Sequence, residues 1–360
     1  YQARQLGLAF NAVLGIILSL ILAFGAGTIL AGVGVADALM QPARTYLQIV
    51  GGFCILNALI PICSSYLRAF GFSKEPLYAS IIGNVINFCL NAFFLFVLHK
   101  GVAGVATATV VSRIINLVIV VLLGAVLVKA KKHPERESNR EVMGQIIRIG
   151  LPSACETAIY NVSMTLVIRF LNQMDAQGLN VTARSYTMQI TNFSYCVGAA
   201  LAQANAIMTG WRIGAKEYDA CDRGTRKAAI IGVIVAVILE TMFALCSGWI
   251  MQLFSKDPQM VSLVGKLLAI DIVLEMGRVT NLVYGQALKT SGDAVFPVVM
   301  GACFMILCSV GGTYLFGIRL GLLAVGAYIG MAGDECVRAV GMYLRWKSGK
   351  WKEKGLVKSR

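Results

Sequence analysis

The 360-residue sequence is 57% hydrophobic and 14% charged, with a mean hydropathy of +0.72. A chain of this length and apolarity is not a water-soluble globular domain, and we expect a membrane protein. The net charge of +14 comes from short cationic runs between apolar segments, without a nucleic-acid motif, so we expect no nucleic-acid partner. Ten scattered cysteines without a CxxC pair and two histidines argue against a metal centre or a disulfide framework.

A bilayer core requires about 20 apolar residues per helix, and ten segments of the sequence meet that length. They lie near residues 5–31, 43–66, 76–98, 102–128, 146–171, 184–209, 228–250, 259–286, 295–317 and 320–345. Alternate loops carry most of the Lys and Arg, which assigns these loops and the C-terminal tail to the cytoplasm. The sequence therefore predicts an all-α, polytopic protein of the plasma membrane, which we expect to be a monomer.

Two loops far apart in the sequence are copies of each other. Residues 67–76 and 288–297 both read Leu, a cation, two residues, Gly, four residues, Pro, at a numbering offset of 221. Further on, residues 101–105 match residues 321–325 at an offset of 220. In each copy we expect Gly to let the chain turn, Pro to open the next helix and the cation to face the lipid headgroups. The residues of this repeat-loop motif are Arg68, Gly71, Pro76, Lys289, Gly292 and Pro297.

The duplication predicts two lobes. A polar linker, residues 129–145, separates an N-terminal lobe (1–128) from a C-terminal lobe (146–345), and residues 346–360 form a basic tail. Subtracting the repeat offset from the second lobe leaves the first lobe two helices short. We therefore expect ten of twelve helices here, in two pseudo-symmetric six-helix lobes of which the first is incomplete, a plan typical of membrane carriers.

Ionisable groups at membrane depth cost several kcal/mol unless they are paired or hydrated, so each is a functional candidate. The second lobe has six such carboxylates, Glu156, Glu240, Asp271, Glu275, Asp334 and Glu335, opposed by Arg169, Arg278 and Arg338. Even if all three cations are paired, three acids remain, which favours a proton or Na⁺ relay. The close spacing of Glu275 and Arg278, and of Arg338 after Asp334 and Glu335, fits structural salt bridges equally well.

Glu156, one turn after a helix-starting Pro152, has no partner on its own helix. For Glu240 and Asp271 the alternative to a direct role is a position near a helix end, facing loop or water. Amides are a second group of candidates. Asn84, Asn87 and Asn91 fall on one helix face and fit either interhelical hydrogen bonds or a cavity wall. Asn281, Gln189 and Asn192 are further candidates for lining a cavity.

Other chemistry finds little support. There is no GxxxxGK[ST] phosphate loop and no large soluble domain, so we expect no use of ATP. Without a His-rich cluster or a nucleophile elbow, we expect no enzyme and no cofactor beyond a transiently bound H⁺ or Na⁺.

Several motifs together resemble a known family. They are the paired loops, Gly83-Asn84-x-x-Asn87, Gly150-Leu-Pro-Ser-x-x-Glu156, Glu275-x-Gly-Arg278-x-x-Asn281 and Asp334-Glu335-x-x-Arg338. In this order they resemble a bacterial MATE (multidrug and toxic compound extrusion) transporter, and the resemblance covers essentially the whole sequence as the third to twelfth helices of that family.

The resemblance implies an antiporter that exports small organic, often cationic and amphipathic compounds in exchange for H⁺ or Na⁺, by alternating access of two lobes. In some branches a Glu of the seventh helix and an Asp of the tenth bind the coupling ion. Here Glu156 lies a turn closer to the Pro, the position of that Asp falls near Arg278, and a fifth-helix Asp of another branch corresponds to Asn91. The alternatives are a lipid-linked saccharide flippase of the related superfamily, which requires a strongly cationic cavity, and a membrane-embedded transferase.

Overall fold

The protein is helical throughout the residues that the computed structural model describes, which are 2–33, 37–128, 138–175 and 178–353. No strand occurs among them, so the predicted all-α fold is confirmed. The chain divides into two compact units, Tyr1–Ile146 and Ile147–Arg360. Of the predicted linker, residues 129–137 lie outside the described residues, and the helix α6 (Asn139–Met174) begins within the remainder.

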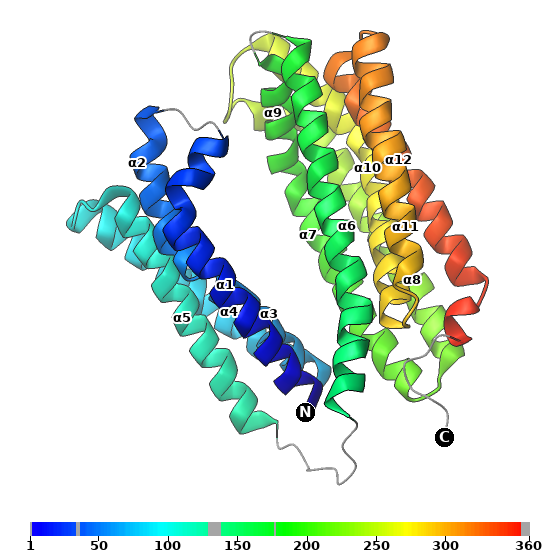
Figure 1. Cartoon of the computed structure of the whole chain (residues 1–360). Coiled ribbons are helices and arrows are strands. Elements are labelled where there is room, and N and C mark those ends of the chain that lie inside the picture. The colour runs from blue at the N-terminus through cyan, green and yellow to red at the C-terminus, as the bar shows by residue number, and fades with distance from the viewer. Residues whose placement is uncertain (1, 34–36, 129–137, 176–177, 354–360) are drawn as a thin grey trace. The chain divides into compact units, whose positions relative to one another are not determined.

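The first unit is a bundle of long helices (Figure 1). Its elements are α1 (Gln2–Val33), α2 (Asp37–Tyr46), the π-helix η1 (Leu47–Gly51), α3 (Ile55–Ala69), α4 (Lys74–Ala92), the π-helix η2 (Phe93–Val97) and α5 (Gly101–Leu127). Helix α3 packs against both α1 and α5, and α4 packs against α5. Tyr66, Leu67 and Val120 form part of the core where α3 and α5 meet.

The second unit is organised around one central helix. Its elements are the rest of α6, α7 (Leu179–Gly214), α8 (Tyr218–Leu245), α9 (Ser247–Met251), α10 (Pro258–Thr290), α11 (Val295–Phe304), the π-helices η3 (Met305–Val310) and η4 (Thr313–Arg319), α12 (Leu323–Lys347) and the 3₁₀-helix η5 (Lys350–Glu353). Helix α10 packs against α7, α8 and α12, so its side chains are buried on several sides. The N-terminus of α10 is capped by Asp257, whose Oδ1 accepts from the Gln259 N–H at 3.0 Å.

Five helices of the described residues are long and apolar enough to cross a membrane. They are Arg4–Ala31, Lys74–Val97, Gly101–Leu127, Tyr218–Leu245 and Val295–Arg319, and the pair Met40–Gly51 and Ile55–Ala69, bent by 41°, makes a sixth if it is one span. The other four predicted spans correspond to α6, α7, α10 and α12, which are long but carry more polar and charged side chains. The total of ten spans stays a prediction.

Helices α6, α7 and α8 begin earlier than the sequence predicted, because a helix continues past the apolar run into polar residues that water solvates. Helix α6 begins at Asn139 instead of near residue 146, and α8 begins at Tyr218 instead of near residue 228. Pro152 therefore lies inside α6 and does not start it, which corrects the prediction. Because Pro has no N–H, α6 lacks one backbone hydrogen bond at this point.

The duplicated loops have the same backbone geometry. Gly71 has φ +90° and Gly292 has φ +93°, the left-handed region that a side chain disfavours. Each glycine N–H donates to the carbonyl three residues earlier, at 3.0 Å in the first loop and 3.1 Å in the second. Pro76 and Pro297 lie in the first turns of α4 and α11, as predicted.

Replacing Gly71 by Ala is expected to destabilise the protein by about 1 kcal/mol, because Ala bears the steric cost of a positive φ. A Cβ at Gly71 meets no atom within 4 Å, so the backbone conformation alone determines the effect. The matched control is Gly7→Ala inside α1, where a Cβ also meets nothing and helix propensity favours Ala. Thermal unfolding of both variants in detergent checks the prediction, and a thermal midpoint of Gly71→Ala equal to or above that of Gly7→Ala contradicts it.

The second match between the copies has a different register from the one predicted. The sequence aligned Gly101 with Gly321, at an offset of 220. In the structure, His99 (φ +49°) corresponds to Gly321 (φ +68°), and Gly101 (φ +52°) corresponds to Leu323 (φ +53°). The offset is therefore 222. The alignment matched glycine with glycine, whereas the equivalent backbone positions pair each glycine with a different residue.

Backbone hydrogen bonds support the offset of 222. The Lys100 N–H donates to the Phe94 carbonyl at 2.9 Å, and the Leu322 N–H donates to the Phe316 carbonyl at 3.1 Å. Since the preceding loops are related by an offset of 221, the second copy holds one additional residue between the two matches. A π-turn accommodates an extra residue, and the additional π-helix Met305–Val310 lies in this interval.

The predicted basic tail, residues 346–360, is partly packed onto the second unit. Trp346 and Trp351 are both buried, and their rings stack at 4.1 Å. The Trp346 indole N–H donates to Asp222 Oδ1 on α8 at 2.7 Å. Residues 354–360 of the tail lie outside the described residues.

Candidate functional site

The second unit contains a cavity of about 680 Å³. Its lining comes mainly from α6, α7, α10 and α12, the four helices that are more polar than the other spans, with η3 adding two residues. The charged side chains that line it are Glu156, Arg184, Asp271, Arg278, Lys289, Asp334, Glu335 and Arg338. Four acids and four cations thus share one cavity among helices of predicted membrane depth.

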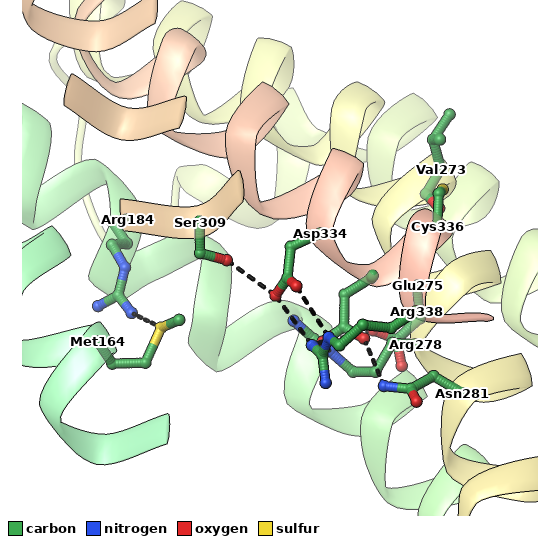
Figure 2. Close-up of polar contacts among 11 residues, drawn as sticks. Met164, Arg184, Val273, Glu275, Arg278, Asn281, Ser309, Asp334, Cys336 and Arg338 are labelled. Carbon is green, nitrogen blue, oxygen red and sulfur yellow. Dashed lines mark hydrogen bonds and ion pairs between the residues drawn. The ribbon is translucent and has the colours of Figure 1, made fainter. Parts of the chain in front are cut away.

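Two arginines and three carboxylates form a connected network between α10 and α12 (Figure 2). Arg278 contacts Glu275 on its own helix at 2.8 Å and Glu335 on α12 at 3.5 Å. Arg338 contacts Asp334 at 2.8 Å and Glu335 at 2.9 Å. Glu335 therefore bridges the two guanidinium groups, and both ion-pair sets predicted from spacing come together in one cluster.

Neutral side chains complete the network. The Ser309 hydroxyl of η3 donates to Asp334 Oδ2 at 2.9 Å, and the Asn281 amide donates to Glu335 Oε2 at 3.0 Å (Figure 2). Asp334 and Arg338 are 2% and 4% exposed, so they are shielded from water. With three carboxylates against two cations, the network carries an excess negative charge when all its groups are ionised.

Two further acids are buried with carboxylate oxygens that have no hydrogen-bond partner among the described residues. Asp271 is 2% exposed and its Oδ2 accepts no hydrogen bond, while both oxygens of the fully buried Glu240 accept none from the described residues. Asp271 lines the cavity beside Arg278 and Glu335. The alternative that these two acids face loop or water was wrong, because packing of α10 against α7 and α8 covers both side chains.

Glu156 has a partner that the sequence did not predict. Its Oε2 lies 2.6 Å from Lys289 Nζ, which joins α6 to the end of α10. The prediction that the loop cation Lys289 faces the headgroups was wrong, because the ion pair draws it onto the cavity wall. Its counterpart in the first loop, Arg68, donates locally to Ser65 at 3.2 Å.

The predicted amides divide into several groups. Asn192 and Asn281 line the cavity, whereas Gln189 is exposed and does not. In the first unit, Asn87 donates to the Ser112 hydroxyl on α5 at 3.2 Å and Asn91 donates to Asn87 at 3.0 Å. This interhelical bonding matches one of the two interpretations left open for the amides. Asn84 is exposed.

Arg184 is a cavity cation that the sequence analysis missed. The predicted helix began at residue 184 and placed Arg184 at its end, but α7 begins at Leu179, so Arg184 lies in its second turn. The signal was present in Asp175, which precedes the helix as a capping residue. Arg169, which had been counted among the opposing cations, is exposed and does not line the cavity.

Apolar side chains cover the rest of the wall and suit an organic ligand. Met164, Met188 and Tyr195 line the cavity beside Tyr160 and Tyr328. Thioethers adapt to ligands of different shape and contact aromatic rings favourably. A cavity with flexible apolar walls and a few convergent charges is a typical small-molecule site.

The sequence also matches known proteins. The model of the MatE family matches residues 1–93 and 152–315. An uncharacterized transporter of Bacillus subtilis, YisQ, is 32% identical over 99% of this chain and 79% of its own length. The probable multidrug resistance protein NorM of Thermotoga maritima is 23% identical over 88% of this chain and 68% of its own length.

Solved structures share the fold. A multidrug resistance MATE family transporter of the MOP superfamily, in an outward-facing conformation, superposes with a TM-score of 0.88 at 17% identity, covering 98% of this chain and 79% of its own. A MATE crystal structure in the bent conformation gives a TM-score of 0.86 at 18% identity, covering 96% and 78%. At this level of identity the likeness concerns the fold alone.

Proposed function

Because the chain belongs to the MatE family of membrane transporters, we propose that it exports small organic compounds across the plasma membrane in exchange for H⁺ or Na⁺. The protein is a multi-pass membrane transporter and not an enzyme. The family match supports extrusion of drugs or toxins, since relatives are named as probable multidrug resistance proteins. Export by alternating access of two lobes, in a monomer, belongs to the same proposal.

The proposal of ion coupling rests on the environment of Asp271. It lines the cavity, is nearly fully buried, and has an oxygen without a hydrogen-bond partner. An ionised carboxylate in such a place costs several kcal/mol. A bound H⁺ or Na⁺ removes that cost, so occupancy by the ion and occupancy by a substrate cation compete for one acid.

The network around Glu335 supplies the neighbouring charges. Glu275 has one oxygen on Arg278 and one without a partner, which makes it the second coupling candidate. Replacing Glu275 by Gln does not leave Arg278 without a carboxylate partner, because Glu335 still contacts that guanidinium. Asp334 and Arg338, with every charge paired, are assigned to positioning α12.

The experiment is export by the protein in sealed vesicles under one imposed ion gradient at a time. We expect a fluorescent organic cation to leave against its gradient when either a H⁺ gradient or a Na⁺ gradient, but not both equally, is applied. Vesicles without protein and vesicles with an ionophore that dissipates the gradient are the controls. Export at the same rate with and without the gradient contradicts coupling.

The flippase alternative requires a strongly cationic cavity for a pyrophosphate. The cavity of the second unit has equal numbers of acidic and cationic lining residues, so its charge does not favour that ligand. The membrane-embedded transferase is excluded, because the chain belongs to a family of transporters and not of enzymes.

A further inference from the structure

Arg184 is a buried cation with no carboxylate partner among the residues that the structure describes. It is 7% exposed, and among those residues it donates from Nη2 to the Met164 thioether at 3.7 Å (Figure 2). Its Nε has no hydrogen-bond partner among the described residues. A thioether is a weak acceptor, whereas a guanidinium has five N–H donors. Most of the hydrogen-bonding capacity of Arg184 is therefore unused.

The other cavity cations are all paired. Arg278, Lys289 and Arg338 each lie within 2.8 Å of a carboxylate oxygen. Within the described part of the chain, Arg184 is the one lining cation without such a contact. An unpaired buried charge is destabilising, and a bound anion would remove that cost.

Asp175, the acid closest to Arg184 in the sequence, accepts hydrogen bonds from other groups. Asp175 accepts from the Leu179 N–H at 2.9 Å and from the Asn180 N–H at 3.0 Å, and so caps α7. Burial acts to raise the pKa of Asp175, but hydrogen bonds from Asn180, Leu179 and Gly178 outweigh it and hold the pKa below its ordinary value. The capping role explains why Asp175 does not neutralise Arg184.

The surroundings of Arg184 define the ligand. Met164, Met188 and Tyr328 line the same cavity, and these side chains favour an apolar or aromatic body. A guanidinium binds a carboxylate through two parallel N–H donations, which is its strongest common pairing. We propose that Arg184 binds a carboxylate of the exported compound, so that the substrates include aromatic acids and zwitterions as well as cations. The inference depends on the proposed export function for its substrate, but the binding site does not depend on ion coupling.

The test is equilibrium binding of two matched probes to the detergent-solubilised full chain. One probe is a fluorescent xanthene dye with a free benzoate, and the other is its methyl ester, which lacks the negative charge. We expect the free acid to bind wild type about tenfold or more tightly than the ester. Arg184→Gln should abolish this preference by weakening the acid alone, and Arg184→Lys should retain part of it. The exposed Arg169→Gln is the matched control and should keep the full preference.

Equal affinity of wild type for the two dyes overturns the inference, as does equal loss of both dyes in Arg184→Gln. If Arg184→Gln does not fold, the wild-type comparison and Arg184→Lys still decide. Export assays separate the two proposals. Preferential binding of the acid without gradient-driven export of either dye contradicts the export proposal and supports the Arg184 site. Export of both dyes without a binding preference for the acid supports the export proposal and contradicts the Arg184 site.

Discussion

Replacing Asp271 by Asn is expected to reduce gradient-driven export at least about tenfold while the protein stays folded. The carboxylate is the cavity acid without a hydrogen-bond partner on Oδ2, so it is the group that gains most from binding H⁺ or Na⁺. Asn has nearly the same shape but binds no proton and lacks the charge that attracts Na⁺. Since no ion pair of Asp271 is broken, the thermal midpoint should be unchanged or higher.

The measurement is export from vesicles together with thermal unfolding in detergent. The matched control is Asp219→Asn in the first turn of α8, an exposed acid that does not line the cavity. Export by Asp271→Asn at the wild-type rate would place coupling at another acid, with Glu275→Gln as the next variant to examine. Loss of export together with loss of folded protein would assign Asp271 a structural role.

The largest loss of stability is expected from Asp334→Ala. This change removes two contacts of Arg338, at 2.8 and 2.9 Å, and leaves a guanidinium that is 4% exposed with Glu335 alone. Removing one partner of a buried ion pair costs about 3 kcal/mol or more. We therefore expect a large fall of the thermal midpoint and a low yield of folded protein.

Two controls separate the ion pair from the rest of the network. Ser309→Ala deletes only the hydroxyl that donates to Asp334, so we expect a loss of about 1 kcal/mol. The double variant Asp334→Ala/Arg338→Ala should lose less stability than the sum of the single variants, because the two changes remove the same pair of contacts. An unchanged thermal midpoint in Asp334→Ala would show that the pair does not support the fold.

Local sequence patterns were sufficient to predict the helices. Apolar runs of membrane length, the glycines of the duplicated loops and the prolines after them determine short-range structure, and the structure has them at these places. The carboxylates of the site were also recognised, since an acid in an apolar run is unusual wherever it points. Pro152 was misplaced because an apolar run marks the hydrocarbon and does not mark where a helix begins.

The ion pairs between distant helices could not be predicted from the sequence. Lys289 and Glu156 belong to helices that are far apart along the chain, and only the tertiary structure brings them together. Arg184 was missed because its depth depends on the cap at Asp175 and not on the apolar run that follows. A contact between distant helices depends on crossing angles and side-chain directions, and a single sequence records neither.

The offset of 222 also relates two hydrogen bonds, one in each unit. It relates Asn87 to Ser309 and Ser112 to Asp334, so the hydrogen bond from Asn87 to Ser112 in the first unit is the counterpart of the bond from Ser309 to Asp334 in the second. Each unit thus ties two helices together with a hydrogen bond at equivalent positions. In the first unit the bond joins two neutral side chains, whereas in the second unit the acceptor is a carboxylate that also pairs with Arg338. The same backbone positions therefore hold a neutral contact in one unit and part of a charged network in the other.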